Sequence, residues 1–564
     1  MPIRPLLLLT ALLAPDAPQV VGGRWESLLV LEDYPHRSLN LGNAALRIGD
    51  VTGDGVEDFA VAAYLDTLLR TQDGTVRVHS GTDGSMVYIV AGDKRESEFG
   101  RTLDVLQDVD GDGRPDLVVG APRNDGDVFH VERGAVHVLS GATGFEISKS
   151  GGLAAFDHFG TSVATLGDVN LDGSEDFASG APDADTFGFT DNGTVSVHSG
   201  ATGATLFEIH GAADGERLGL VVAGIGDVDG DGLGDLAIGL PDADTAAGPD
   251  AGRIQIHSGS GGLLLRTVDG AVSSARLGSV IARLGDLDGD GRDEIGLGMP
   301  DADGPAGAGA GIAQIVSPRS AMPLAVFHGE APGERFGAAI AGDADLDRDG
   351  VPDFVIGAPG ASPGGRTGAG QANLYSGSSR LEIERFAGLR AVEALGSSIA
   401  ILDDMSGDGS LEVLATSPQS NLGAGSATIF GVLPLMTVSP RELSVSAGGT
   451  VLISVDLSST AGGAYFQILG SGRGHGSTRI GGLEVPLLPD RIFEQTLNGN
   501  YPAYCLGFSG VLSALGQAGA AILVLPGQLN PALAGREIQL AAVAHDGAGA
   551  GIHSSVAVSL RFTP

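Results

Sequence analysis

Residues 108–122 read DVDGDGRPDLVVGAP, in which four aspartates within nine residues stand directly before an apolar run. Carboxylates this close repel one another, and they lose solvation when they pack beside apolar strands. A bound cation would relieve both costs. The stretch therefore predicts a metal-binding loop, and its recurrence along the chain allows that prediction to be examined.

The stretch occurs seven times at a nearly constant spacing. The copies begin at Asp50, Asp108, Asp168, Asp227, Asp286, Asp345 and Asp404, so successive starts differ by 58, 60, 59, 59, 59 and 59 residues. A Phe-Gly or Leu-Gly pair precedes each acidic loop, and a short apolar run, often ending in Gly-Ala-Pro, follows it. An alternating strand such as GTVRVHSG follows, and a weaker fourth strand completes every unit except the last. Seven units built on four short strands predict an all-β, seven-bladed propeller.

The order Phe-Gly, DxDxDGxxD, Gly-Ala-Pro resembles the FG-GAP repeat, the blade unit of the seven-bladed propeller in integrin α chains and in many secreted bacterial proteins. The resemblance covers about residues 25–433. Ala62-Ala63-Tyr64 and Thr416-Ser417-Pro418 replace Gly-Ala-Pro in the first and last units, where we expect less regular blades. The resemblance implies calcium loops on one rim and a ligand-binding face on the other, although one fold hosts many functions.

The sequence divides into three regions. Residues 1–22 carry one basic residue, Arg4, followed by a short apolar core, which predicts a secretory signal peptide that is too short to span a bilayer. Residues 23–433 hold the propeller, and strand-like runs in residues 434–564 predict a small β-sandwich. The last repeat lacks a fourth strand, so we expect residues 25–35 (WESLLVLEDYP) to complete the seventh blade.

The charge of the chain limits its partners. Its 70 acidic and 32 basic residues give a formal net charge of −38, which argues against nucleic acid and anionic membranes and favours cations. The single cysteine, Cys505, leaves an exported protein without internal disulfides, and it has no nucleophile motif around it. No later segment is predicted to cross a membrane. Bound metal ions are therefore expected to stabilise the fold in place of disulfides.

In DxDxDGxxD, positions 1, 3 and 5 offer side-chain oxygens, position 7 a backbone carbonyl and position 9 a further carboxylate, while the glycine at position 6 permits the turn. This oxygen-only set favours calcium over zinc or magnesium, at up to seven sites with a structural role. Loop by loop, the predicted ligands are Asp50, Thr52, Asp54, Val56 and Asp58; Asp108, Asp110, Asp112, Arg114 and Asp116; Asp168, Asn170, Asp172, Ser174 and Asp176; Asp227, Asp229, Asp231, Leu233 and Asp235; Asp286, Asp288, Asp290, Arg292 and Glu294; Asp345, Asp347, Asp349, Val351 and Asp353; and Asp404, Ser406, Asp408, Ser410 and Glu412.

The alternative interpretation is a set of solvated acidic turns without metal. It applies most to the first, third and seventh loops, where Thr52, Asn170 and Ser406 stand at position 3. Glu294 and Glu412 place a longer side chain at position 9. An EF-hand is excluded, because position 12 is apolar and the flanking residues are strand-like.

The same resemblance implies that candidate ligand-binding residues lie on the opposite rim. Each has the alternative role of a turn residue or an inter-blade ion pair, and they are Asp125, Asp127, Asp183, Asp185, Asp242, Asp244, Asp301, Asp303, Arg217, Arg276 and Arg335. His79, His198 and His257 occupy one position in three separate units, so they do not form a site together. The sequence holds no Gly-x-Ser-x-Gly, His-Glu-x-x-His or phosphate-loop motif, so no catalytic residues are assigned.

Three functional hypotheses follow. The leading one is a secreted or cell-surface, calcium-stabilised propeller that binds a protein or glycan ligand on the face opposite the calcium loops, as an adhesion module without catalysis. The second is a calcium-dependent carbohydrate-active enzyme such as a polysaccharide lyase. The third is a structural protein of an envelope or matrix.

Overall fold

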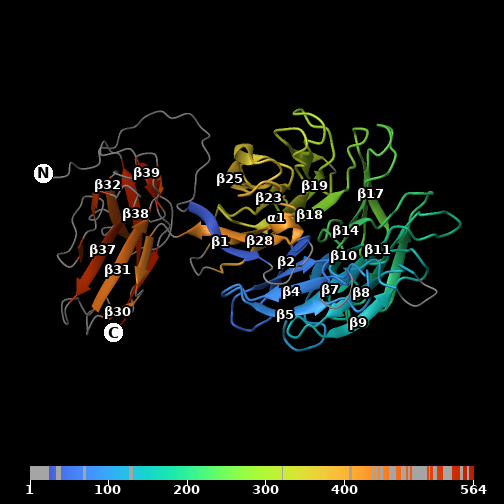
Figure 1. Ribbon diagram of the computed structural model, residues 1–564, viewed down its shortest axis with the longest axis horizontal. Coiled ribbons are helices and arrows are strands. Elements are labelled where there is room, and N and C mark those ends of the chain that lie inside the picture. Colours follow the sequence, from blue (N-terminus) through green and yellow to red (C-terminus); the bar gives the residue numbers. More distant parts are fainter. Residues whose placement is uncertain are drawn as a thin grey trace. The chain divides into compact units, whose positions relative to one another are not determined.

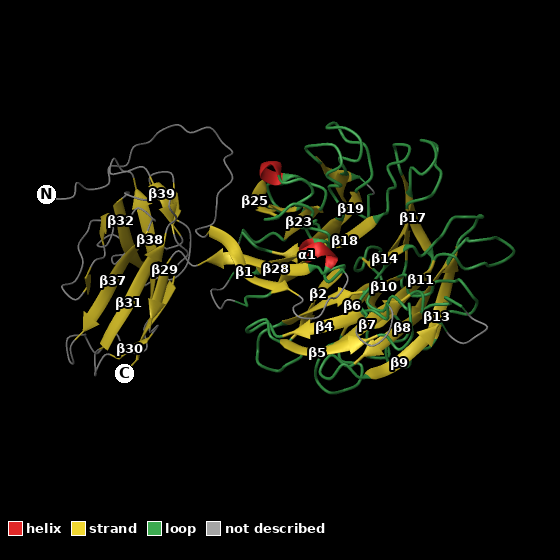
Figure 2. Cartoon of the chain, viewed as in Figure 1, coloured by secondary structure: helices red, strands yellow, loops and turns green. Residues whose placement is uncertain are grey.

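The computed structural model describes residues 24–32, 40–67, 72–125, 131–320, 322–347, 349–405 and 410–433, and beyond these only strands of the C-terminal region. The predicted signal peptide lies outside the described residues. The chain divides into two compact units, and Ser27–Phe430 is the propeller. Strands and loops make up nearly all of it (Figure 2).

The propeller is a ring of seven four-stranded sheets (Figure 1). Six of them are meanders of consecutive strands: β2 (Ala44–Gly49), β3 (Asp58–Ala63), β4 (Thr75–His79) and β5 (Met86–Ala91); β6 (Thr102–Leu106), β7 (Asp116–Ala121), β8 (Ala135–Leu139) and β9 (Glu146–Gly151); β10 (Ser162–Gly167), β11 (Asp176–Ala181), β12 (Thr194–His198) and β13 (Thr205–His210); β14 (Val221–Gly224), β15 (Leu236–Leu240), β16 (Arg253–His257) and β17 (Leu264–Asp269); β18 (Val280–Gly285), β19 (Glu294–Met299), β20 (Ile312–Val316) and β21 (Pro323–His328); β22 (Ala339–Ala344), β23 (Asp353–Ala358), β24 (Gln371–Tyr375) and β25 (Glu382–Ala387).

The seventh blade closes the ring with strands from both ends of the propeller sequence. Its sheet has the order β1-β28-β27-β26, built from β1 (Arg24–Glu32), β26 (Ile399–Leu402), β27 (Glu412–Ser417) and β28 (Ser426–Leu433). The blue β1 lies beside the orange β28 in Figure 1. The expectation that residues 25–35 complete the last blade is thus confirmed for the strand itself, and both the seven-bladed propeller and the all-β class are confirmed.

Burial follows the order of strands in each blade. All six residues of β7 (DLVVGA) are buried, and so are all five of β8, whereas the outer strand β9 is mostly exposed or half-buried. The second strand needs no polar alternation because neighbouring blades cover both of its faces. In the first interface, for example, Val76 and Val78 of the first blade share a core with Leu117 and Val119 of the second. Each blade therefore depends on its neighbours for burial.

The Phe-Gly and Gly-Ala-Pro motifs meet at these interfaces. A Cβ atom on Gly120 of the second blade would collide with the carbonyl oxygen of Gly160 in the third. Gly160 has a φ of +85° and donates its N–H to the carbonyl of Gly180 at 2.9 Å. Phe159, beside it, forms a bridge with Gly134 of the second blade. Close approach and left-handed backbone thus explain why glycine stands at both positions.

The first and last blades keep their four strands despite their altered motifs. Ala62, in place of the motif glycine, is fully buried and pairs with Ala44 and Val76. In the seventh blade, the Thr416 hydroxyl accepts a hydrogen bond from the backbone N–H of Ser398 at 3.0 Å. Both blades form four-stranded sheets, so the sequence departures remain local.

Helix is limited to α1 (Ser420–Gly423) and the 3-10 turn η1 (Pro363–Gly365) among the described residues. The C-terminal region contains β29 (Met436–Ser439), β30 (Glu442–Ser444), β31 (Gly449–Asp456), β32 (Tyr465–Ser471), β33 (Thr478–Ile480), β34 (Leu483–Val485), β35 (Cys505–Leu506), β36 (Ser509–Val511), β37 (Gln517–Val524), β38 (Glu537–His545), β39 (Gly551–Ser554) and β40 (Val558–Thr563). One sheet has the order β29-β31-β37-β35, and another contains β30, β40, β38, β32 and β36, with β39 paired to β38. The β-sandwich stays a prediction.

Ring closure by β1 gives a testable prediction. Leu29 and Leu31 pack against the core shared by the seventh and first blades, whereas Val30 is 46% exposed. We expect the double variant Leu29→Ala, Leu31→Ala to lower the free energy of unfolding by about 2–4 kcal/mol, because the truncations remove partly buried methyl groups and leave their space in the interface unfilled. Urea denaturation measures this, with Val30→Ala as the control; equal losses for both variants would contradict closure by β1.

Candidate metal centres

Each acidic loop joins the first and second strands of its blade, and position 9 lies at the start of the second strand. The position-9 residues are all fully buried, at 0% exposure: Asp58, Asp116, Asp176, Asp235, Glu294, Asp353 and Glu412. A carboxylate this deep must be hydrogen-bonded or paired with a cation, because an isolated buried charge is very costly.

Backbone N–H groups satisfy part of that need. In the second blade, Val109 donates its N–H to Asp116 Oδ2 at 2.8 Å, and Gly141 donates to Asp116 Oδ1 at 3.0 Å. Gly141 belongs to the turn between the third and fourth strands, so one carboxylate ties two loops together. The same glycine donor serves Asp58, Asp176, Asp235 and Asp353, from Gly81, Gly200, Gly259 and Gly377.

These hydrogen bonds do not fully offset the energetic cost of burying the ionised carboxylates. Burial raises the pKa of Asp116 to about 6 and that of Asp353 to about 7. It also raises the pKa of Asp176 and Asp235. A raised pKa means that the ionised carboxylate lacks stabilisation in the protein alone, which a bound cation would supply.

Position 1 organises the loop from the other side. Asp108 accepts N–H bonds from Gly111 at 2.6 Å, Asp112 at 3.0 Å and Gly113 at 2.7 Å. Gly113, at position 6, has a φ of +88°, which glycine adopts without strain. The backbone therefore curls around the Asp108 carboxylate and brings the other side chains toward it.

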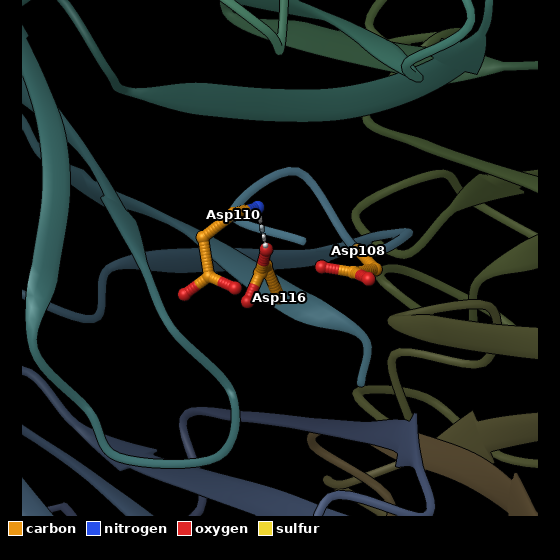
Figure 3. A group of neighbouring side chains, drawn as sticks. All are labelled: Asp108, Asp110 and Asp116. Carbon is orange, nitrogen blue, oxygen red and sulfur yellow. Dashed lines mark hydrogen bonds between the residues drawn. The ribbon is translucent and has the colours of Figure 1, made fainter. Parts of the chain in front are cut away.

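Among the described residues, the carboxylates converge in four of the acidic loops. Their ligand atoms lie within 4.8 Å of one another in four groups: Asp108, Asp110 and Asp116; Asp227, Asp229 and Asp235; Asp345, Asp347 and Asp353; and Asp286, Asp288 and Asp290. Figure 3 shows the first group, with Asp110 donating its N–H to Asp116. The first three groups combine positions 1, 3 and 9. Such an oxygen-only set fits a hard divalent cation, so these loops could hold a metal ion.

The first and third loops do not bring three carboxylates together among the described residues. In the third loop, Asn170 donates from Nδ2 to Asp172 Oδ2 at 2.9 Å and to Asp176 Oδ1 at 3.3 Å. The amide thus bridges two carboxylates. In the first loop, the Thr82 hydroxyl donates to Asp54 Oδ2 at 2.6 Å. Ser406 and Asp408 of the seventh loop lie outside the described residues.

Two arginines have a role that their place in the motif did not predict. Arg114 and Arg292 occupy position 7, where only the backbone carbonyl was predicted to act. The Arg292 guanidinium crosses to the fourth blade and donates to the carbonyls of Asp227, at 3.1 Å, and of Val228. Arg114 likewise donates to the carbonyl of Val51 in the first blade. Each of them places a positive charge beside the acidic loop of the preceding blade.

The opposite rim is built from the connections after the second strand and before the first, because the strands of a blade alternate in direction. Here a chain of contacts, the ion-pair ladder, runs across blades two to five. It consists of Glu98–Arg123 at 3.5 Å, Arg123–Glu132, Glu132–His158 at 3.2 Å, His158–Asp183 at 2.7 Å, Asp183–Arg217 at 2.8 Å, Arg217–Asp242 at 3.4 Å and Asp242–Arg276 at 2.6 Å. Arg335 and Asp301 form a separate pair at 3.1 Å.

The ladder contains four of the predicted polar residues of this rim, namely Asp183, Arg217, Asp242 and Arg276, and the separate pair contains Asp301 and Arg335. The remaining aspartates close their own loops: Asp125 accepts an N–H bond from Glu132, Asp185 from Asp191, Asp244 from Asp250 and Asp303 from Gly309. Asp127 lies outside the described residues. These contacts favour the structural alternative for the residues named, and any ligand would have to meet other groups on this rim.

The remaining candidates have structural surroundings. His79 stacks on Phe59, and His198 stacks on Phe177, each in the interior of a blade. Burial lowers the pKa of His198 to about 4, so it is neutral at pH 7. No helix in the described part of the chain is long and apolar enough to cross a membrane.

His158 was missed in the sequence, because the residue before Phe-Gly differs from blade to blade. Its bond to Asp183, and the second one to Glu132, raise its pKa above the ordinary 6.5.

The contacts of protonated His158 therefore stabilise the fold fully below pH 6.5, and this contribution is lost as the pH rises through the raised pKa. In the wild type we expect the free energy of unfolding to fall by about 1 kcal/mol as the pH rises through this range, and His158→Gln should not show this fall. Urea denaturation across pH measures it. The exposed His328→Gln should keep the wild-type profile, and an unchanged profile for His158→Gln would contradict this assignment.

Comparison with known proteins places this geometry in context. The family model described as FG-GAP repeat matches residues 99–139, 159–198 and 336–372. These are the three units that combine Phe-Gly with Gly-Ala-Pro. Among solved structures, that of Saccharomyces cerevisiae Sqt1 covers 73% of this chain and 99% of its own, with 10% identity and a TM-score of 0.44, too low to support an argument.

Similar curated proteins are integrin α chains. Integrin alpha-V of Gallus gallus is 32% identical over 216 residues, which are 36% of this chain and 20% of that protein. Integrin alpha-5 of Xenopus laevis is 30% identical over 217 residues, with the same shares, and integrin alpha-PS2 of Drosophila melanogaster is 35% identical over 232 residues, 38% and 16%. The match thus spans about a fifth or less of these relatives. The chain contains FG-GAP repeats, folded into a seven-bladed β-propeller that is similar in sequence to integrin α chains.

Proposed function

We propose that the protein is an exported, calcium-binding propeller that serves as an adhesion or ligand-binding module and carries out no chemistry. The similarity to integrin α chains supports an interaction role, and the predicted signal peptide supports export. The calcium proposal rests on the geometry of the acidic loops.

One observation carries the proposal. In the second, fourth and sixth loops a fully buried carboxylate from position 9 meets the carboxylates of positions 1 and 3 within 4.8 Å. Three negative charges at this separation destabilise the fold unless a cation lies among them. Solvated acidic turns would not need to bury the position-9 side chain.

Calcium fits these groups better than its competitors. The donors are oxygens alone, and the loop offers up to five from the protein, which suits the large coordination shell of calcium. In the second loop the holding residues would be Asp108, Asp110, Asp112 and Asp116 with the carbonyl of Arg114. When bound, the ion would supply positive charge that offsets carboxylate repulsion. The chain itself contributes the curled backbone and the hydrogen bonds that position Asp116.

Ligand binding is assigned to the rim opposite the acidic loops. The ion-pair ladder joins neighbouring blades there, and the loops that follow the second strand have unlike sequences in different blades. Such a rigid frame with variable loops is a common way to present a recognition surface. A protein or glycan is the expected class of ligand.

Calcium should stabilise the chelator-stripped protein. At roughly millimolar calcium, sites with dissociation constants near ~10⁻⁴ M would add about 1.4 kcal/mol each, so three sites would raise the melting temperature by about 5–10 °C. Calorimetric titration and thermal unfolding measure the stoichiometry and the shift.

Charge-matched variants separate site binding from general charge effects. The triple variant Asp110→Asn, Asp229→Asn, Asp347→Asn removes one negative charge from each of the three ligand sets, leaving only an amide oxygen at position 3, and should abolish most of the calcium response. The control triple Glu96→Gln, Asp214→Asn, Asp250→Asn removes the same charge at exposed sites outside the acidic loops and should respond like the wild type. Equal calcium responses of the two triple variants would contradict the calcium proposal.

The absence of catalysis is tested by incubating the calcium-loaded protein with acidic polysaccharides. A lyase would generate unsaturated sugars with a new ultraviolet absorbance. We expect no product, and binding to an immobilised glycan or protein ligand without turnover. Product formation that chelator abolishes would establish the enzyme alternative instead.

A further inference from the structure

The fifth acidic loop differs from most of the others at three positions that lie together. Position 9 is Glu294, a glutamate that the fifth loop shares with the seventh, whereas the other five loops have aspartate. The residue two places after the third strand, which is glycine in the first four blades and the sixth, is Pro318. The turn of the sixth blade that faces the fifth carries Arg380 where Gly84, Gly144, Gly203 and Gly262 stand in other blades.

Pro318 removes a hydrogen bond from the buried carboxylate. In the other blades this residue is the glycine whose N–H binds position 9, as Gly259 binds Asp235 at 3.1 Å. Proline has no N–H to donate. Glu294 keeps only the bond from Leu287, whose N–H donates to Oε2 at 2.8 Å. Its Oε1 is buried and has no hydrogen-bond partner among the described residues.

Glu294 also lies outside the carboxylate group of its loop. The converging atoms there belong to Asp286, Asp288 and Asp290, whereas position 9 completes the group in the second, fourth and sixth loops. A cation bound by the fifth group would therefore lack the buried carboxylate as a close ligand. The loop retains a buried acid that needs a different partner.

Arg380 supplies a positive charge at this place. Its backbone has a φ of +62°, a conformation that favours glycine, so the side chain is held at some cost in strain. Arg380 Nη2 donates to the carbonyl of Leu287 at 3.2 Å, and the N–H of that same residue binds Glu294. Nη1 is buried without a hydrogen-bond partner among the described residues. Burial lowers the pKa of Arg380, and the charges of Glu294 and Asp288 oppose that shift.

The buried carboxylate of Glu294 and the half-buried guanidinium of Arg380 thus share Leu287, and each has a buried atom without a hydrogen-bond partner among the described residues. Arg292 does not play this part in the fourth loop, because Asp235 there keeps its glycine donor and its place among the carboxylates. We infer that Arg380 is the resident cation of the fifth acidic loop, so that this loop keeps its conformation without metal and binds calcium more weakly than the second, fourth and sixth loops. This inference rests on the proposed calcium function.

Hydrogen–deuterium exchange of the full chain, with calcium chloride and with chelator, resolves the loops separately. We expect peptides over residues 108–116, 227–235 and 345–353 to lose protection in chelator, while residues 286–294 keep theirs. If all four loops respond equally to calcium, this inference fails and the calcium proposal stands. If none responds, the calcium proposal fails, and the inferred difference between loops fails with it.

Removal of the charge should reverse the behaviour of the fifth loop. In Arg380→Gln we expect residues 286–294 to lose protection in chelator and to regain it with calcium, with an affinity for this loop on the order of tenfold higher, because a like charge has been removed from the cation site. A purely structural role would predict lost protection without gained calcium affinity. Arg380→Lys, which keeps the charge, should behave as the wild type, and a lysine variant that resembles the glutamine variant would overturn the inference.

Two further variants guard against misfolding and general charge effects. Arg319→Gln removes an exposed arginine of the neighbouring turn in the fifth blade and should leave all four loops unchanged. The triple variant Glu294→Asp, Pro318→Gly, Arg380→Gly restores the pattern of the other blades. It should bind one more calcium ion than the wild type at a free calcium concentration that fills the other loops; an unchanged stoichiometry would overturn the inference.

Discussion

The structure depends on a buried carboxylate at the start of the second strand of every blade. This group is fully buried beside the covered second strand and would be strongly destabilising if it were ionised and unpaired. The fold compensates with one or two N–H groups from the acidic loop and, in five blades, one from the glycine after the third strand. The carboxylate therefore connects both turns at one end of a blade, and its remaining need for positive charge makes this end a cation site.

The ring transmits that dependence from blade to blade. Each blade buries its second strand only through its neighbours, and the glycines of the two motifs allow the backbones to approach. A disturbed acidic loop would shift the second strand and weaken two interfaces at once. Closure by β1 removes the two free blade faces that an open array would expose, which explains why the sequence takes the last strand from its beginning.

The repeat spacing, the strand order and the closing strand could be predicted from the sequence, because each depends on local patterns and on the count of strands per unit. The convergence of Asp108, Asp110 and Asp116 followed from motif spacing in the same way. The roles of Arg114, Arg292 and Arg380 could not be predicted, since their side chains act on the preceding blade. That direction depends on how adjacent blades pack. The ion-pair ladder was foreseen only as an alternative, for the same reason.

Basic residues are scarce in this chain, so the position of each arginine decides which carboxylates it can neutralise. With 32 basic residues against 70 acidic ones, the chain cannot neutralise all its carboxylates internally. Several of its arginines lie at the two rims of the propeller, beside acidic groups of adjacent blades. On one rim they join acids of adjacent blades, as Arg217 joins Asp183 and Asp242. On the other rim three of them lie over acidic loops of the preceding blade. Where the buried carboxylate lacks its glycine donor and an arginine lies beside it, as with Glu294 and Arg380, the loop needs less positive charge from solution, so the blades are expected to differ in their demand for metal although their sequences repeat. The repeat fixes the geometry of seven similar loops, and the neighbouring side chain decides how much each depends on calcium.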